Sequence, residues 1–340
     1  MKNKIIIIIA IASILFSCRK VLNIDLKDNE KKIVMQSILM PDSIVKVNLS
    51  KSLGLLEDFD TIIFLNNAEV KIYEDNVLVE NLKYNGFGDY IGTKQLNKNK
   101  TYKILAQHPD FKEQAWAEVD FVEQVPINNL SYQAEFQDIT QPLYDTMGNY
   151  IKDTTYKIIS ALIIKITIDD PKDIDNFFLL SITQPLPITT FNEQTLKEDT
   201  VGYYEEPVSF TIKGIETDPE QNTGLSNTNI IILPTIYLSN KINGKVFSDL
   251  WFKNSTYTIN AKISVYFDYN KKINDRRFTY QINLYSTPKD VFLFATSLSN
   301  YFSAQGSPFS EPVNVYSNVK GGFGFVSSIN VSQNSIVIVP

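Results

Sequence analysis

The chain has 340 residues, a formal net charge of -6, one cysteine and one histidine. An acidic chain whose basic residues form only short pairs lacks the electrostatic footprint of a nucleic-acid-binding protein, so we expect no nucleic-acid partner. A single cysteine excludes an intramolecular disulfide, and one cysteine with one histidine cannot build a zinc or copper site from these ligands.

The first segment has the order of a secretory signal peptide. Lys2 and Lys4 are followed by twelve uncharged residues, 5–16, and then by the small residue Ser17 before Cys18. A membrane-spanning helix needs about 20 apolar residues, so a removable signal is favoured over a permanent transmembrane helix. We expect cleavage before Cys18.

Cys18 occupies the position that the bacterial lipobox requires. In that motif the thiol takes a diacylglycerol, the preceding peptide (1–17) is removed, and the new amine is acylated, with palmitate as a common chain. Because stable anchoring needs more than one acyl chain, this modification predicts lasting membrane attachment. The alternative is an ordinary secretory signal with an incidental cysteine. The polar residues 18–32 are predicted to form the lipidated tether.

Short apolar runs begin at residue 33 and recur up to about residue 125. They are separated by Asn, Asp and Gly turns, which we place at 75–76, 86–89 and 97–99. Strands spaced at about ten residues predict an immunoglobulin-like or transthyretin-like β-sandwich over 33–126. The clearest of these strands are expected at 33–35, 45–49, 70–73 and 102–105.

Residues 127–340 are predicted to form a larger β-rich domain. Residues 132–155 contain turn formers without sustained periodicity, and 186–207 and 213–229 are predicted to be long polar loops, where binding often occurs. Strands are expected at 156–168, 177–183, 208–212, 230–238, 257–269 and 278–285.

One helix is predicted near 288–303, where Thr287 can cap it and Pro288 suits its first turn. We expect its apolar stripe to pack on a sheet rather than to form a ligand groove. The chain is therefore predicted to be all-β, with two sandwich-like domains and one packed amphipathic helix after a signal peptide and a short tether. The stripe consists of Val291, Phe294, Leu298, Tyr301 and Phe302.

His108 is the only histidine that could serve as the base of a Ser-His-Asp arrangement. It lies in the sequence Gln-His-Pro-Asp after a predicted strand, which is typical of a turn. We therefore do not expect His108 to be catalytic, and we predict that the protein has no catalytic residue, no cofactor and no enzyme activity.

Two acidic loops leave calcium binding through oxygen ligands open. Both fall short of a calcium-binding motif. In the first, Gly224 comes one place late for an EF-hand loop and Asn229 stands where the bidentate glutamate belongs, so a solvated acidic loop is favoured and no metal site is predicted. The first loop contains Asp218, Glu220 and Asn222, and the second contains Asp169, Asp170, Asp173 and Asp175.

The residues 307–324, from Ser-Pro-Phe-Ser-Glu-Pro to Gly-Gly-Phe-Gly, resemble the C-terminal signature of domain-of-unknown-function family 4249, a family of Bacteroidetes lipoproteins. The start of the mature chain, at 24–26 and 32–34, is similar to the start of that family. Asp170-Pro171 followed by residues 176–178 resembles its mid-chain motif. The resemblance covers nearly the whole mature chain.

This resemblance implies an outer-membrane lipoprotein that works beside a TonB-dependent receptor. It brings no catalytic residues and no cofactor, and Cys18 is the one position that it assigns a chemical role. Arg19 and Lys20 follow the cysteine where surface-exported lipoproteins often carry acidic residues, so the face of the outer membrane stays open.

The lipobox and the resemblance together favour a non-enzymatic, lipid-anchored accessory or binding protein of the outer membrane. The resemblance alone implies that it partners a TonB-dependent barrel in substrate uptake. One alternative is a structural or adhesive envelope lipoprotein. A second is a glycan or peptide hydrolase that uses two carboxylates or calcium in the second domain. The sequence does not identify a ligand.

Overall fold

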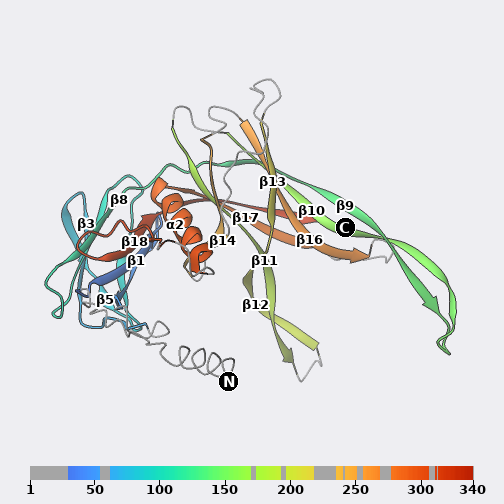
Figure 1. Ribbon diagram of the computed structural model, residues 1–340, viewed down its shortest axis with the longest axis horizontal. Coiled ribbons are helices and arrows are strands. Elements are labelled where there is room, and N and C mark those ends of the chain that lie inside the picture. The colour runs from blue at the N-terminus through green and yellow to red at the C-terminus, as the bar shows by residue number, and fades with distance from the viewer. Residues whose placement is uncertain are drawn as a thin grey trace, which may run out of the picture. The chain divides into compact units, whose positions relative to one another are not determined.

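A computed structural model describes ten stretches of the chain (Figure 1). Cys18, the predicted signal peptide and most of both acidic loops lie outside them. Almost all described residues belong to one unit, made of residues 32–52 and 62–340. The described stretches are 30–53, 62–169, 174–192, 197–217, 235–239, 242–250, 256–268, 277–305, 311 and 313–339.

Two sheets form the N-terminal sandwich and share one apolar core. In β1, inward residues such as Ile33, Met35 and Leu39 are buried at alternate positions, which is the period-two pattern of a strand with one face in a core. One sheet has the order β18 (Phe323–Ser328), β1 (Ile33–Leu39), β2 (Ile44–Lys51), β6 (Asp89–Gln95) and β5 (Lys83–Tyr84). The other has the order β4 (Val77–Asn81), β3 (Glu69–Glu74), β7 (Tyr102–Gln107) and β8 (Ala115–Val119).

The strand β18 comes from the C-terminal end of the chain and pairs in parallel with β1, from Val34 opposite Phe323 onward. Just before it, Lys320 exchanges backbone hydrogen bonds of 2.8 and 2.9 Å with Trp116 of β8. The ammonium of Lys320 also lies 4.3 Å from the centre of the Trp116 ring, a cation–π distance. The domain boundary predicted after residue 126 stays a prediction. β18 follows this boundary in the chain but pairs with β1, which precedes it.

The C-terminal sandwich also consists of two sheets around one core. The first has the order β13 (Thr211–Thr217), β16 (Thr256–Asp268), β10 (Tyr150–Asp169) and β9 (Ile127–Tyr144). The second has the order β14 (Thr235–Ser239), β15 (Ile242–Ser248), β11 (Phe177–Asn192), β17 (Phe278–Thr287) and β19 (Asn330–Ile338), and β12 (Lys197–Pro207) pairs with β11. With one packed helix, these sheets confirm the all-β prediction.

Two hairpins continue past the strands that support them. Among the described strands, β10 pairs with β16 only from Ile158 onward, and its earlier residues pair with β9 alone. Likewise β11 pairs with β17 as far as Thr183 and continues with β12 (Figure 1). The predictions of an irregular segment at 132–155 and a polar loop at 186–207 are therefore wrong. Both faces of these strands are largely exposed, so the sequence has no inward–outward alternation to detect.

The helix α2 spans Lys289–Gln305, close to the predicted 288–303. Val291 and Ala295 are fully buried in a cluster that also contains residues of β11, β15 and β18. The aromatic stripe packs as predicted only in the first turns, because Tyr301 and Phe302 are 37% and 61% exposed. The helix therefore contacts both sandwiches through its N-terminal half.

Candidate functional site

A cavity of about 360 Å³ opens at the edge of the N-terminal sandwich, where β4 of one sheet approaches β6 of the other. Its floor is apolar, because the inward residues Val45, Ile72 and Leu96 are buried there. Val77 and Leu78 line it as well, although they are 68% and 46% exposed. The remaining lining residues are Glu74, Val79, Glu80, Lys94, Gln95 and Tyr102.

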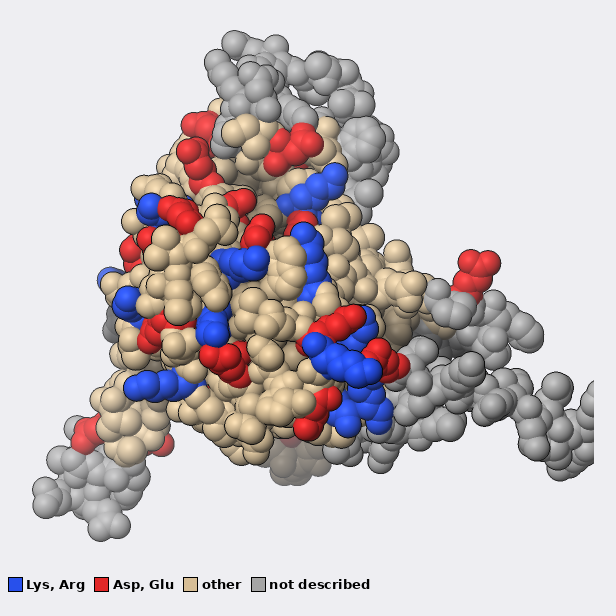
Figure 2. Space-filling model, turned by 90° about the vertical axis from the view of Figure 1, so that its left-hand side faces the viewer, with Lys and Arg blue, Asp and Glu red and all other residues tan. Residues whose placement is uncertain are grey.

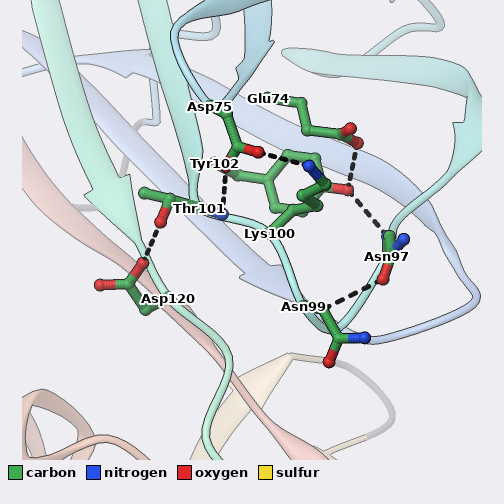
Figure 3. Close-up of polar contacts among 8 residues, drawn as sticks. All are labelled: Glu74, Asp75, Asn97, Asn99, Lys100, Thr101, Tyr102 and Asp120. Atoms are coloured by element: carbon green, nitrogen blue, oxygen red, sulfur yellow. Dashed lines mark hydrogen bonds and ion pairs between the residues drawn. The ribbon is translucent and has the colours of Figure 1, made fainter.

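Tyr102 connects the cavity to the surrounding turns (Figure 3). Its hydroxyl donates to the Glu74 carboxylate at 2.7 Å and accepts from the Asn97 backbone N–H at 2.7 Å. Burial of the side chain, which is 1% exposed, together with the neighbouring Glu74 charge raises the pKa of Tyr102 to about 12. The Tyr102 hydroxyl therefore stays protonated at neutral pH and donates its hydrogen bond to Glu74.

Glu80 is held by three donors at the other side of the cavity. The backbone N–H groups of Thr93 and Lys94 and the Thr93 hydroxyl all donate to its carboxylate. Burial alone would raise the pKa of Glu80, but these hydrogen bonds outweigh it and lower the pKa below its usual value. The Lys94 ammonium donates to the Val79 carbonyl at 3.1 Å. The cavity is therefore lined by two carboxylates and by one ammonium that already donates a hydrogen bond within the protein.

The turns beside the cavity are fixed by polar contacts. Asp75 and Asn76 have φ of 47° and 67°, as the predicted two-residue hairpin turn between β3 and β4 requires. The Asp75 carboxylate accepts from the Lys100 ammonium and the Thr101 backbone N–H, and the Thr101 hydroxyl donates to Asp120 (Figure 3). These contacts hold Tyr102, the next residue of the chain, in place.

The face of the molecule that carries the N-terminal sandwich has no large patch of one charge. Figure 2 shows basic and acidic side chains interspersed among neutral ones across this face. A dominant electrostatic attraction to a polyanion or a polycation is not built into it.

His108 follows β7 and is buried, with 7% of the residue exposed. Its Nδ1 accepts the backbone N–H of Asp110 at 3.2 Å, and its ring contacts Phe111 edge to face. The residue therefore lies in a turn, as predicted, and stabilises that turn through its side chain.

The other predicted positions lie partly or wholly outside the described residues. This applies to Cys18, to the loop at 218–222, and to Asp170 and Asp173. Asp169 accepts hydrogen bonds from the side chains of Asn128 and Thr256. Within the stretches that the structure describes, no three His, Cys, Asp or Glu side chains gather as a metal-binding group.

The tip of the β9–β10 hairpin presents apolar side chains to solvent. Asp145 organises the turn: its carboxylate accepts the backbone N–H groups of Met147 and Asn149 and the Asn149 side-chain amide, at 2.8 to 3.0 Å. These hydrogen bonds, that of the Asn149 side chain above all, lower the pKa of Asp145. The exposed apolar residues are Leu143 at 44%, Tyr144 at 55%, Met147 at 86%, Tyr150 at 58% and Ile151 at 53%.

A family described as a domain of unknown function, DUF4249, matches residues 19–335, nearly the entire chain. The chain belongs to the DUF4249 family. Its membership confirms the family resemblance that the sequence indicated. No curated protein matches the DUF4249 chain.

Among solved structures, the DUF4249 chain is similar to the crystal structure of a "Putative membrane anchored protein" from Corynebacterium diphtheriae, with 9% identity and a TM-score of 0.20. The match covers 75% of this chain and 54% of that chain, so it spans little more than half of the relative. Among the helices that the structure describes, none has the length and apolar character of a membrane span.

Sequence reasoning did not find the cavity or the hairpin tip. Glu74, Glu80 and Lys94 come from three different strands, and no spacing in the chain connects them. The tip did carry a signal, because Leu143, Tyr144 and the apolar residues after the turn lie close together in a segment rich in turn formers.

Proposed function

We propose that this protein is a non-enzymatic, lipid-anchored accessory protein of the outer membrane, with Cys18 as its anchor. Its partner is a protein embedded in that membrane, and the family resemblance points to a TonB-dependent receptor engaged in substrate uptake. Family membership and the signal-peptide pattern support the location. The observation that carries the binding role is the exposed tip of the β9–β10 hairpin.

The tip has the properties of a preorganised protein contact. Exposed apolar patches on soluble domains commonly mark interaction sites, and aromatic and methionine side chains are enriched in such interfaces. The hydrogen bonds of Asp145 fix the turn before any partner arrives, so binding orders little additional chain. The hairpin can therefore insert Met147 into a recess of a partner without first folding.

An ionised group at the apex favours a protein partner over the lipid interior. The lowered pKa of Asp145 keeps its carboxylate charged, and moving a charged carboxylate into the bilayer centre is costly. A protein recess can leave that carboxylate in water at its rim while the apolar side chains are buried. The tip therefore suits a cleft with an apolar floor.

Co-purification tests this function. The tagged, lipidated protein is extracted from native outer membranes in mild detergent, and the proteins that accompany it are identified and quantified by mass spectrometry. We expect one outer-membrane barrel in stoichiometric amount. Substituting Met147→Ser together with Tyr150→Ser should lower its recovery at least about tenfold, because central apolar anchors dominate binding free energy.

The control is Val337→Ser, which changes a side chain that is 47% exposed on β19. It should leave the recovery unchanged, and the midpoint of thermal unfolding should stay the same in all variants. Recovery of the protein alone from membranes would contradict the accessory role, and the adhesive alternative would then lead. Equal loss in the control and the tip variant would remove the hairpin from the interface.

A further inference from the structure

The N-terminal cavity combines an apolar floor with a half-buried carboxylate. Val45, Ile72 and Leu96 offer only carbon atoms to an occupant, so a ligand gains free energy there by burying an aliphatic chain. At about 360 Å³ the cavity lies near the lower end of the range for small-molecule sites. It therefore fits one slender group rather than a ring system with several substituents.

The two carboxylates in the cavity differ in the hydrogen bonds that they already make. Glu80 is occupied by three donors, and the Lys94 charge also lowers its pKa. In the described part of the chain, Glu74 accepts one hydrogen bond, from Tyr102, and forms no ion pair with a lysine or arginine. A carboxylate can accept about four hydrogen bonds, so Glu74 has capacity left for a donor from a ligand.

The two nearby ammonium groups donate hydrogen bonds to acceptors other than Glu74, although the Glu74 charge, after that of Asp75, also raises the pKa of Lys100. The Lys94 ammonium donates to the Val79 carbonyl, and the Lys100 ammonium pairs with Asp75. An anionic ligand would meet the negative charges of both Glu74 and Glu80. A cationic ligand would meet a complementary charge at Glu74 and an apolar surface beside it.

We propose that this cavity binds a primary alkylammonium group, whose chain lies on Val45, Ile72 and Leu96 and whose nitrogen donates to the Glu74 carboxylate. Such a group has two sources, namely the end of a lysine side chain in a polypeptide and a free aliphatic amine. The proposal does not depend on the partner at the hairpin tip.

Isothermal titration calorimetry of the full chain with matched probes tests the site. n-Pentylammonium should bind at least about tenfold more tightly than n-pentanol, because a hydrogen bond to a charged group is stronger than a neutral one. Each methylene removed from the amine should weaken binding by up to about fourfold. Equal affinity for the amine and the alcohol, or no measurable binding of either, would overturn the proposal.

Two variants of β3 test whether the Glu74 carboxylate is the group that binds the ammonium. Glu74→Gln removes the carboxylate but keeps an oxygen that can accept the Tyr102 hydroxyl, and it should weaken pentylammonium binding at least about tenfold. Glu69→Gln is the matched control, because Glu69 lies on β3 outside the cavity and pairs with Lys71. Identical effects of the two variants would overturn the proposal.

A third variant tests whether the alkyl chain packs on the apolar side chains of the cavity, without changing a residue of the core. Leu78 is 46% exposed, so Leu78→Ser should leave the fold intact while it flattens the dependence of affinity on chain length. An unchanged dependence would contradict burial of the chain in this cavity. Tighter binding of N-acetyl-lysine methylamide than of pentylammonium would identify a polypeptide lysine as the source, and the reverse order would identify a free amine.

Discussion

Tyr102 shows how one hydroxyl can stabilise two segments of the chain. Its ring fills the N-terminal core, while its oxygen joins the carboxylate at the end of β3 to the backbone that precedes β7. A buried hydroxyl must satisfy its hydrogen bonds within the protein, and here both its donor and its acceptor function are used.

Replacing Tyr102 with Phe should lower the free energy of unfolding by about 1 to 2 kcal/mol, because the Asn97 N–H and Glu74 each lose a partner while the apolar packing stays. Urea denaturation measures the change. Tyr84→Phe is the control, since Tyr84 is 46% exposed, and it should change stability by less than about 0.5 kcal/mol. Equal effects would show that the Tyr102 hydroxyl contributes nothing.

The same hydroxyl predicts how stability depends on alkaline pH. The pKa of Tyr102 is raised to about 12 in the folded protein, from the ordinary value of 10.0 that applies to the unfolded chain. The stabilising contribution of the hydroxyl is therefore complete below pH 10.0 and is lost as the pH rises toward 12. The stability difference between wild type and Tyr102→Phe should therefore shrink over this range. Urea denaturation at a series of pH values checks it, and a constant difference would contradict the raised pKa.

At the scale of elements, glycines permit the close approach of the C-terminal segment to the N-terminal sandwich. Gly324 has a φ of +115°, and a Cβ at this position would lie 2.0 Å from the Met35 carbonyl oxygen. At Gly321, with a φ of +71°, a Cβ would lie 2.1 Å from the Gln114 carbonyl oxygen. These two glycines thus have a packing role: Gly324 lets β18 lie against β1, and Gly321 lets the segment before β18 lie against the start of β8.

Gly324→Ala should cost clearly more than the conformational strain of a positive φ, which is on the order of 1 to 3 kcal/mol, because the added methyl group also collides with the backbone of β1. The matched variant is Gly86→Ala, where φ is +98° and no atom lies within 4 Å of the added Cβ. Urea denaturation compares them. If the two variants cost the same, the contact between β18 and β1 is not as tight as described.

The elements with one buried face could be predicted from the sequence, whereas the two hairpins could not. Alternation predicted β1, β2, β3 and β7 because their inward residues meet a core. Most of β9 and the outer half of β11 lack such a face, so their polar composition suggested loops. The pairing of β18 with β1 could not be predicted either, since a parallel pairing between strands so far apart in the chain leaves no local sequence pattern.

At the scale of the whole molecule, α2 packs in a third apolar cluster, which contains residues from both sandwiches and is separate from their two cores. Phe294 of the helix stacks on Phe325 of β18, with ring centres 4.3 Å apart and an angle of 11° between the planes. Val291 and Ala295 are buried in the same cluster as Leu179 of β11. The sequence predicted the helix and its packing face, but not that this face would contact two sandwiches.

Phe294→Ala should lower the free energy of unfolding by about 2 to 4 kcal/mol, through lost apolar burial and the void that remains. We also expect calorimetric unfolding to become less cooperative, because the two sandwiches lose a shared contact. Phe302→Ala, on the same helix but 61% exposed, is the control and should have little effect. Equal costs for the two variants would show that the buried face of the helix does not hold the two sandwiches together.

The parallel pairing of β1 with β18 also means that a segment more than 280 residues later in the chain covers the edge of β1. Synthesis begins at the N-terminus, so β1 exists long before its neighbour does, and one edge of the first sheet stays unpaired while nearly all the remaining chain is made. An open strand edge is a template for pairing with other chains. A nascent or truncated chain that ends before residue 323 would therefore leave this edge of β1 open to pairing with other chains, which favours aggregation.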